Sequence, residues 1–165
     1  MSYVDEIVRS FYEELREEQK LMGHFIETDE MTTYFIYHDL NQTRVLINVN
    51  TMKELECFRV VFELPTIVPI EKRVELADFF FKKNEYLSLG SYILSFESGK
   101  MIFKSDLDYE HYSADVSNEL FNELMSDCMD ELNFTFPEIM HIIYSSVNPK
   151  FTFKQFNTRN AAYFN

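Results

Sequence analysis

The chain has 165 residues, a formal net charge of −13, and 16% aromatic residues with 17 Phe, 10 Tyr and no Trp. A chain of this length buries roughly 70% of its unfolded surface, so we expect one folded domain that needs no disulfide or metal. The charge argues against nucleic acid and anionic membrane surfaces as partners, because both are negatively charged and attract clustered Lys and Arg.

The two cysteines and the terminal sequence indicate the compartment. Cys57 and Cys128 lie in apolar segments and lack the Cys-x-x-Cys spacing of zinc and redox sites. The N-terminus is acidic without a signal-peptide pattern, and no apolar run approaches the ~18 residues of a membrane span. We therefore expect buried free thiols in a soluble, cytoplasmic protein.

The first half of the chain predicts one helix and three strands. Apolar residues at spacings of three and four predict a helix over residues 2–20. A short extended piece over residues 24–29 precedes predicted strands at 32–39, 44–50 and 55–64, which short connections make antiparallel neighbours. The third strand has an all-apolar face that we expect to point inward, formed by Phe58, Val60, Phe62 and Leu64.

A second helix and a hairpin come next. Pro69 suits the start of a helix, and Asn84 can close it in the left-handed conformation. The apolar positions cover so much of this helix that we expect it to be sandwiched in the core; they are Ile70, Val74, Leu76, Ala77, Phe79, Phe80 and Phe81. Residues 89–96 and 101–105 form the predicted hairpin, in whose turn Gly99 supplies a positive φ.

The third helix is predicted to start after Ser113. Pro137 should interrupt it, and Thr135 with Glu138 forms a capping box for a further helical segment that runs to about Tyr144. The resulting order of elements is α-β-β-β-α-β-β-α. This order predicts an α+β fold, a mainly antiparallel β-sheet with helices packed on it.

Residues 148–165 form a tail that differs from the predicted domain at residues 1–147. Every charge in the tail is positive, and its five aromatic side chains are Phe151, Phe153, Phe156, Tyr163 and Phe164. This aromatic density is atypical of a disordered tail, so we predict that the tail docks and that these five residues bind a partner. Docking in cis and insertion into a neighbouring copy are both open.

A set of turn and core residues extends from the second helix through the hairpin. It comprises Val68-Pro69-x-Glu71-Lys72-Arg73, Asn84 before Leu87, Gly90-x-Tyr92-x-Leu94 and Glu97-Ser98-Gly99-x-Met101-x-Phe103. This pattern resembles the YbjN-like family. With the acidic first helix, the preceding strands and the third helix in matching order, the resemblance covers about residues 1–145, and the aromatic tail lies outside it.

The resemblance implies a fold similar to that of type III secretion chaperones, which are small, acidic, dimeric α+β proteins that hold other polypeptides. Family members have been labelled sensory transduction regulators, and no shared enzyme activity or cofactor is attached to them. The resemblance therefore implies a non-enzymatic, chaperone-like or regulatory homodimer that binds a protein or peptide. The acidic composition favours a basic partner.

The residues themselves show no catalytic, cofactor-binding or metal-binding constellation. The four histidines lack metal-site spacing, and Tyr144-Ser145-Ser146 lacks the Gly-x-Ser-x-Gly elbow that exposes a nucleophile. Two alternatives stay open: an enzyme or enzyme subunit with a cleft near His111, and a small-ligand sensor with an enclosed apolar cavity. An open edge of strand 32–39 or 89–96 is a further candidate, because such an edge can accept a partner strand.

Overall fold

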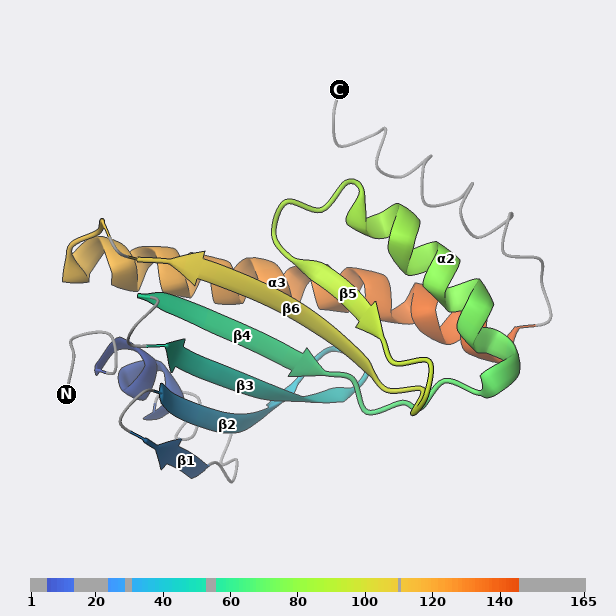
Figure 1. Cartoon of the computed structure of the whole chain (residues 1–165), viewed down its shortest axis with the longest axis horizontal. Coiled ribbons are helices and arrows are strands. Elements are labelled where there is room, and N and C mark those ends of the chain that lie inside the picture. The colour runs from blue at the N-terminus through green and yellow to red at the C-terminus, as the bar shows by residue number, and fades with distance from the viewer. Residues whose placement is uncertain (1–5, 14–23, 29–30, 53–55, 110, 146–165) are drawn as a thin grey trace.

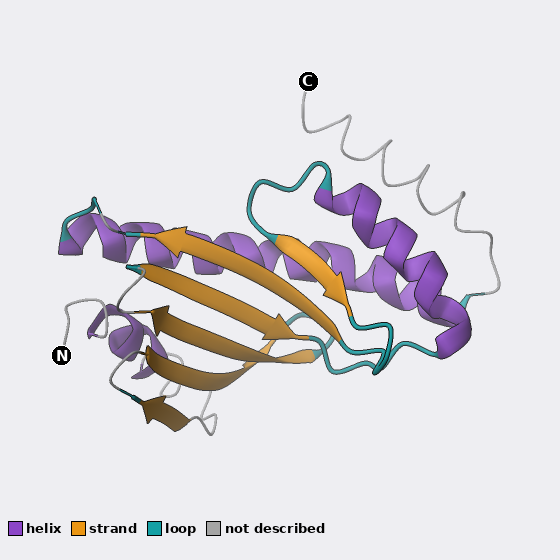
Figure 2. Ribbon diagram, in the orientation of Figure 1, coloured by secondary structure: helices purple, strands orange, loops and turns teal. Residues whose placement is uncertain are grey.

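The computed structural model describes residues 6–13, 24–28, 31–52, 56–109 and 111–145. Its six strands form one antiparallel sheet in the order β1-β2-β3-β4-β6-β5 (Figures 1 and 2). The strands are β1 (His24–Glu27), β2 (Met31–Asp39), β3 (Arg44–Met52), β4 (Cys57–Glu63), β5 (Ser91–Leu94) and β6 (Met101–Asp108). The helices are an N-terminal helix over residues 6–13, the 3-10 turn η1 (Ile70–Lys72) with α2 (Arg73–Asn84), and α3 (Ala114–Tyr144).

The α+β class and the antiparallel sheet are confirmed, but the predicted order lacks one strand. The extended piece after residue 24 is strand β1, which pairs with β2 so that His24 lies opposite Phe35 and Glu27 opposite Thr32. The observed order is therefore one helix, four strands, a helix, two strands and a helix. Four residues are too few to show an alternating pattern. Because β1 pairs with β2, the strand predicted at 32–39 is not an edge of the sheet.

The core lies on one face of the sheet, between the strands and the helices. Alternate residues of β3 and β4 are buried, which confirms the inward face predicted for β4; they are Val45, Ile47, Val49, Phe58, Val60 and Phe62. The N-terminal helix and α3 cover this face, with the ring centroid of Tyr12 at 5.6 Å from Tyr34 and that of Phe121 at 4.9 Å from Phe58. The opposite face carries half-exposed Tyr37, and no described helix covers it (Figure 1).

Helix α2 is not sandwiched in the core, so that prediction is wrong. One side of the helix is buried against the end of the sheet, where Phe80 stacks on Tyr92 at 5.0 Å between ring centroids. Its other side leaves three apolar residues with exposed fractions of 76%, 72% and 67%, namely Ile70, Val74 and Phe81. The composition of a helix reports its apolar area but not the number of elements available to cover that area.

Helix α3 continues through Pro137 as a single helix of 31 residues, which contradicts the predicted break. The Thr135 hydroxyl donates to Glu131 instead of capping a new helix. An internal proline costs about 3 kcal/mol in an isolated helix. Burial on both sides of the proline offsets that cost; the buried residues include Leu132, Phe136, Ile139, Ile142 and Ile143.

The residues that carry the family resemblance fasten the hairpin to α2. Gly99 has the predicted positive φ, at 74°, and an added Cβ would lie 2.5 Å from the carbonyl oxygen of Val68. The Arg73 guanidinium donates to the carbonyls of Val68 (3.1 Å), Phe96 (2.6 Å) and Glu97 (3.1 Å). One arginine therefore fixes the turn of the hairpin against the start of the helix.

Asn84 also joins α2 to the hairpin, but not in the left-handed conformation that the sequence predicted. Among the described residues other than glycine, only Glu56 has a positive φ. The Asn84 amide instead accepts from the Tyr92 N–H at 2.8 Å and donates to the Tyr92 carbonyl at 2.9 Å. The Asn84 side chain takes the place of a neighbouring strand at the outer edge of β5. At Tyr92, the edge predicted at 89–96 is therefore already hydrogen-bonded.

Candidate functional site: a groove between strand β6 and helix α3

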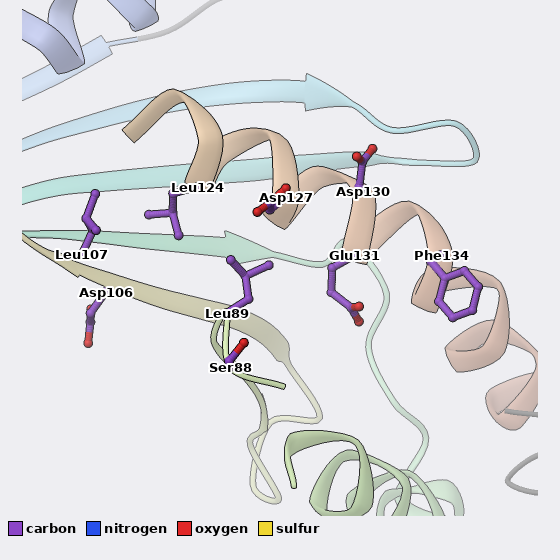
Figure 3. A pocket seen from close by; sticks show the side chains of 9 residues that line it. All are labelled: Ser88, Leu89, Asp106, Leu107, Leu124, Asp127, Asp130, Glu131 and Phe134. Atoms are coloured by element: carbon purple, nitrogen blue, oxygen red, sulfur yellow. The ribbon is translucent and has the colours of Figure 1, made fainter. Parts of the chain in front are cut away.

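A groove of about 810 Å³ lies between β6, α3 and the loop that joins α2 to β5 (Figure 3). Its apolar lining consists of Leu89, Leu107, Leu124 and Phe134, and its polar lining of Ser88, Asp106, Asp127, Asp130 and Glu131. Leu107 and Leu124 mark one end in Figure 3 and Phe134 marks the other, with Leu89 between them. The groove thus combines an apolar floor with acidic walls.

Part of the sheet edge borders this groove. Strand β6 is longer than β5, and its last residue paired with β5 is Lys104, opposite Ser91. The Ser105 hydroxyl then donates to the carbonyl of Leu89 and holds the loop against β6. Beyond that contact, β6 has β4 on one side and no described strand on the other. The main-chain groups of Leu107 face Phe58 of β4, and those of Asp106 face outward. An uncovered edge of this kind can pair with an added strand.

A buried ion pair supports the wall formed by α3. Lys83 of α2 is 3% exposed, and its Nζ lies 2.8 Å from Oε1 of Glu131 and 5.3 Å from the ring centroid of Phe134. The same oxygen of Glu131 accepts from the hydroxyls of Tyr92 (3.0 Å) and Thr135 (2.6 Å). Burial raises the pKa of Tyr92 well above its usual range, so the phenol stays a donor. This network joins α2, β5 and α3.

The groove keeps an excess of negative charge. Asp106 is bound by Arg59 at 2.8 Å and by Lys104 at 2.9 Å. Burial alone would raise the pKa of Asp106, but the hydrogen bonds from these two cations outweigh burial and lower it, so Asp106 stays ionised. Asp127 and Asp130 are exposed on α3, and no described cation pairs with either. A cation from a partner would therefore be favoured beside these two carboxylates.

A second groove, of about 520 Å³, lies on the uncovered face of the sheet. It is lined by Tyr37, Arg44, Leu46, Glu63, Leu64, Pro65, Ile67, Lys100, Met101 and Ile102. Two cations and one carboxylate give this groove no strong charge preference. The groove along β6 is the more selective of the two.

Of the single residues proposed as sites from the sequence, the described part of the chain includes only His111. His111 is exposed in the loop before α3 and lines neither groove. The five predicted partner-binding residues lie outside the described part of the chain; they are Phe151, Phe153, Phe156, Tyr163 and Phe164. Among the described residues, no three His, Cys, Asp or Glu side chains gather as metal ligands, and no helix is long and apolar enough to cross a membrane.

Both cysteines are free, as expected. Cys128 is buried within α3, and burial raises the pKa of its thiol to about 12. Cys57 is only partly buried, and burial raises its pKa as well. Neither thiol is poised to act as a nucleophile, because the reactive form of cysteine is the thiolate.

Comparisons with protein-family models, with curated proteins and with solved structures give no match for this chain. The groove was missed in the sequence because its walls come from three separate segments. Asp127 and Asp130 resemble the solvated face of any amphipathic helix. The predicted hairpin gave no signal of the uncovered end of β6, because strand 101–105 was expected to be shorter than strand 89–96, whereas β6 is longer than β5.

Proposed function

We propose that the protein is a non-enzymatic, chaperone-like domain that binds an extended, basic and apolar segment of another polypeptide. One observation carries the proposal: the uncovered edge of β6 at Asp106 borders an apolar floor and the carboxylates of Asp127 and Asp130. Main-chain groups of an added strand would pair with β6, which gives affinity without dependence on sequence.

The alternation of side chains along a strand explains the expected preference. Successive residues of a bound strand point in opposite directions. One set would rest on Leu89, Leu107 and Leu124, and the other set would point away from this floor. Lys or Arg near the α3 wall would meet Asp127 and Asp130. We therefore expect segments that combine Leu or Phe with Lys or Arg.

The family resemblance supports the same proposal. The pattern typical of YbjN-like proteins implies a fold similar to type III secretion chaperones, whose members hold other polypeptides. The resemblance also implies a homodimer with a regulatory role, which we include in the proposal together with the cytoplasmic location expected from the sequence. Sedimentation equilibrium should then give twice the chain mass of 19.8 kDa.

Neither alternative function has a feature of the described structure in its favour. An enzyme with a cleft near His111 would need this residue to face a pocket, and His111 is exposed outside both grooves. A small-ligand sensor would need an enclosed cavity, and the groove along β6 is open to solvent. Interaction with a polypeptide remains the function that the site supports best.

A selection from random peptides tests the proposal without knowledge of the natural partner. We expect the full-length protein to enrich short peptides that alternate Leu or Phe with Lys or Arg. Replacing both Asp127 and Asp130, in D127N/D130N, should weaken binding of the selected peptides about fivefold at about 0.1 M ionic strength, since an exposed ion pair contributes roughly 0.2–1 kcal/mol.

The matched control is E6Q/E97Q, which removes two exposed carboxylates, one from the N-terminal helix and one from the β5–β6 turn, neither of which lines the groove. This control should leave affinity unchanged to within about 1.5-fold, because charges beyond a Debye length of about 10 Å are largely screened. A selection without enrichment, or equal losses for the two double variants, would refute the assignment of the groove.

A further inference from the structure

Helix α2 carries a continuous apolar stripe that the described part of the chain leaves uncovered. Ile70, Val74, Ala77 and Phe81 follow one another at spacings of four, three and four, so they share one face of η1 and α2. The first, second and fourth of these are more than two-thirds exposed. Single exposed apolar residues are normal, but a row along a whole helix is typical of a surface that packs against another segment.

The end of α3 lies at the same end of α2 as Ile70, the first residue of the stripe. Lys72 Nζ donates to the carbonyl of Ser145 at 2.9 Å, so the last described residue lies next to the first turn of α2, on the side of the helix away from the stripe. At 1.5 Å per residue, η1 and α2 together are about 22 Å long. The segment 146–165 spans about 30 Å even as a helix, and it therefore reaches the far end of the stripe.

The chemistry of the tail and of α2 is complementary. The tail has five aromatic residues, and its only charged side chains are Lys150, Lys154 and Arg159. The helix and its flanks carry exposed Glu71, Asp78 and Glu85 at intervals of seven residues, which places them along one side of the stripe. Lys82 pairs with Asp78. No described cation pairs with Glu71 or Glu85, and these two carboxylates lie at the two ends of the stripe.

A polar atom near the tail's origin also lacks a donor. Glu75 Oε2 lies 3.0 Å from Lys72 Nζ, but Oε1 of the same carboxylate is buried without a hydrogen-bond partner. A buried acceptor left without a hydrogen bond costs about 1–3 kcal/mol. An N–H from the segment that follows Ser145 would satisfy it.

We propose that residues 146–165 pack in cis along the apolar stripe of α2, with aromatic side chains on Ile70, Val74 and Phe81. The three tail cations then lie beside the carboxylates of the helix. This docking is independent of the peptide groove, whose lining includes no residue of α2.

A single tryptophan tests the proposal in the full-length chain, which contains no Trp of its own. In the variant F156W, we expect blue-shifted emission and about threefold less acrylamide quenching than in a free peptide of residues 148–165 with the same substitution. Adding V74S/F81S should restore quenching to the level of the free peptide. These two side chains are exposed, so the fold should persist in the variant.

The control is I93S, because Ile93 is also an exposed apolar residue but lies on β5 outside the stripe. It should leave the tryptophan protected. Quenching at the free-peptide level in F156W itself would overturn the proposal. If the tryptophan loses its protection at the same dilution at which a dimer dissociates, the stripe binds a second copy of the chain instead of the tail. Protection that survives V74S/F81S and disappears in D127N/D130N would place the tail in the groove.

Discussion

At the scale of the residue, Lys83 is the one charged side chain that is buried among the described residues. Its ammonium is buried at 3% exposure and depends on Glu131 for a counter-charge. Removing one partner of a buried pair leaves the other charge uncompensated, which typically costs about 3–5 kcal/mol. The sequence could not predict this role, because Lys82 and Lys83 look alike at the end of a helix.

K83M should therefore lower the free energy of unfolding by about 3 kcal/mol in urea denaturation. The control R44M breaks the exposed pair between Arg44 and Asp39, which should cost less than about 1 kcal/mol. Equal losses for the two variants would mean that the Lys83 pair is solvated in solution.

Cys128 should make stability fall at alkaline pH. The folded protein holds the thiol proton up to a pKa of about 12. The unfolded chain releases it from about pH 8.5, so the unfolded state binds fewer protons between these values, and the thiol contributes a loss of about 1.4 kcal/mol per pH unit. Below pH 8 the thiol is protonated in both the folded and the unfolded state, so it makes the unfolding free energy no more dependent on pH.

C128A should remove that contribution, although it costs stability at every pH because it leaves a cavity. The test compares the slope of unfolding free energy between pH 9 and pH 10.5 in the two proteins, an interval chosen from these pKa values. Comparing slopes also cancels the alkaline contribution of Tyr92, whose pKa is likewise raised. Identical slopes would contradict a buried, protonated thiol.

At the scale of the element, the edge of β5 is protected by a side chain rather than by a strand. In N84A, the N–H and the carbonyl of Tyr92 lose their partners. We expect hydrogen exchange at the Tyr92 amide to accelerate at least tenfold, because about 1.4 kcal/mol of lost protection corresponds to a factor of ten. The amide of Val49, in the centre of the sheet, is the internal reference. Unchanged exchange at Tyr92 would show that other contacts protect this edge.

The strands were predictable wherever a long alternating pattern met a polar turn, and β2, β3 and β4 match their predicted bounds to within two residues. Three features escaped for different physical reasons. Strand β1 is too short for periodicity, and the burial of α3 overrides the local cost of Pro137. Helix α2 has more apolar surface than its neighbours cover, and the sequence of α2 alone does not show which of its apolar residues will stay exposed.

At the scale of the whole molecule, the N-terminal helix and α3 cover one face of the sheet, α2 lies at its β5 end, and no described helix covers the other face (Figure 1). In this arrangement α3 crosses the sheet beside the end of β6 that extends past β5, and the groove lies between them. The α+β class was predictable from the order of elements. The groove was not, because its position depends on the unequal lengths of β5 and β6 and on the path of α3.

The central claim is that the edge of β6 accepts a basic, apolar strand beneath α3. The most direct measurement is a titration of the isotope-labelled full-length protein with a short peptide that alternates Leu and Lys, followed by amide NMR. We predict saturable shifts at Leu107, Leu124 and Asp127, together with slower hydrogen exchange at Asp106, whose amide faces the open edge. The absence of saturable shifts, or shifts confined to Tyr37 and Leu46 on the open face, would contradict the claim.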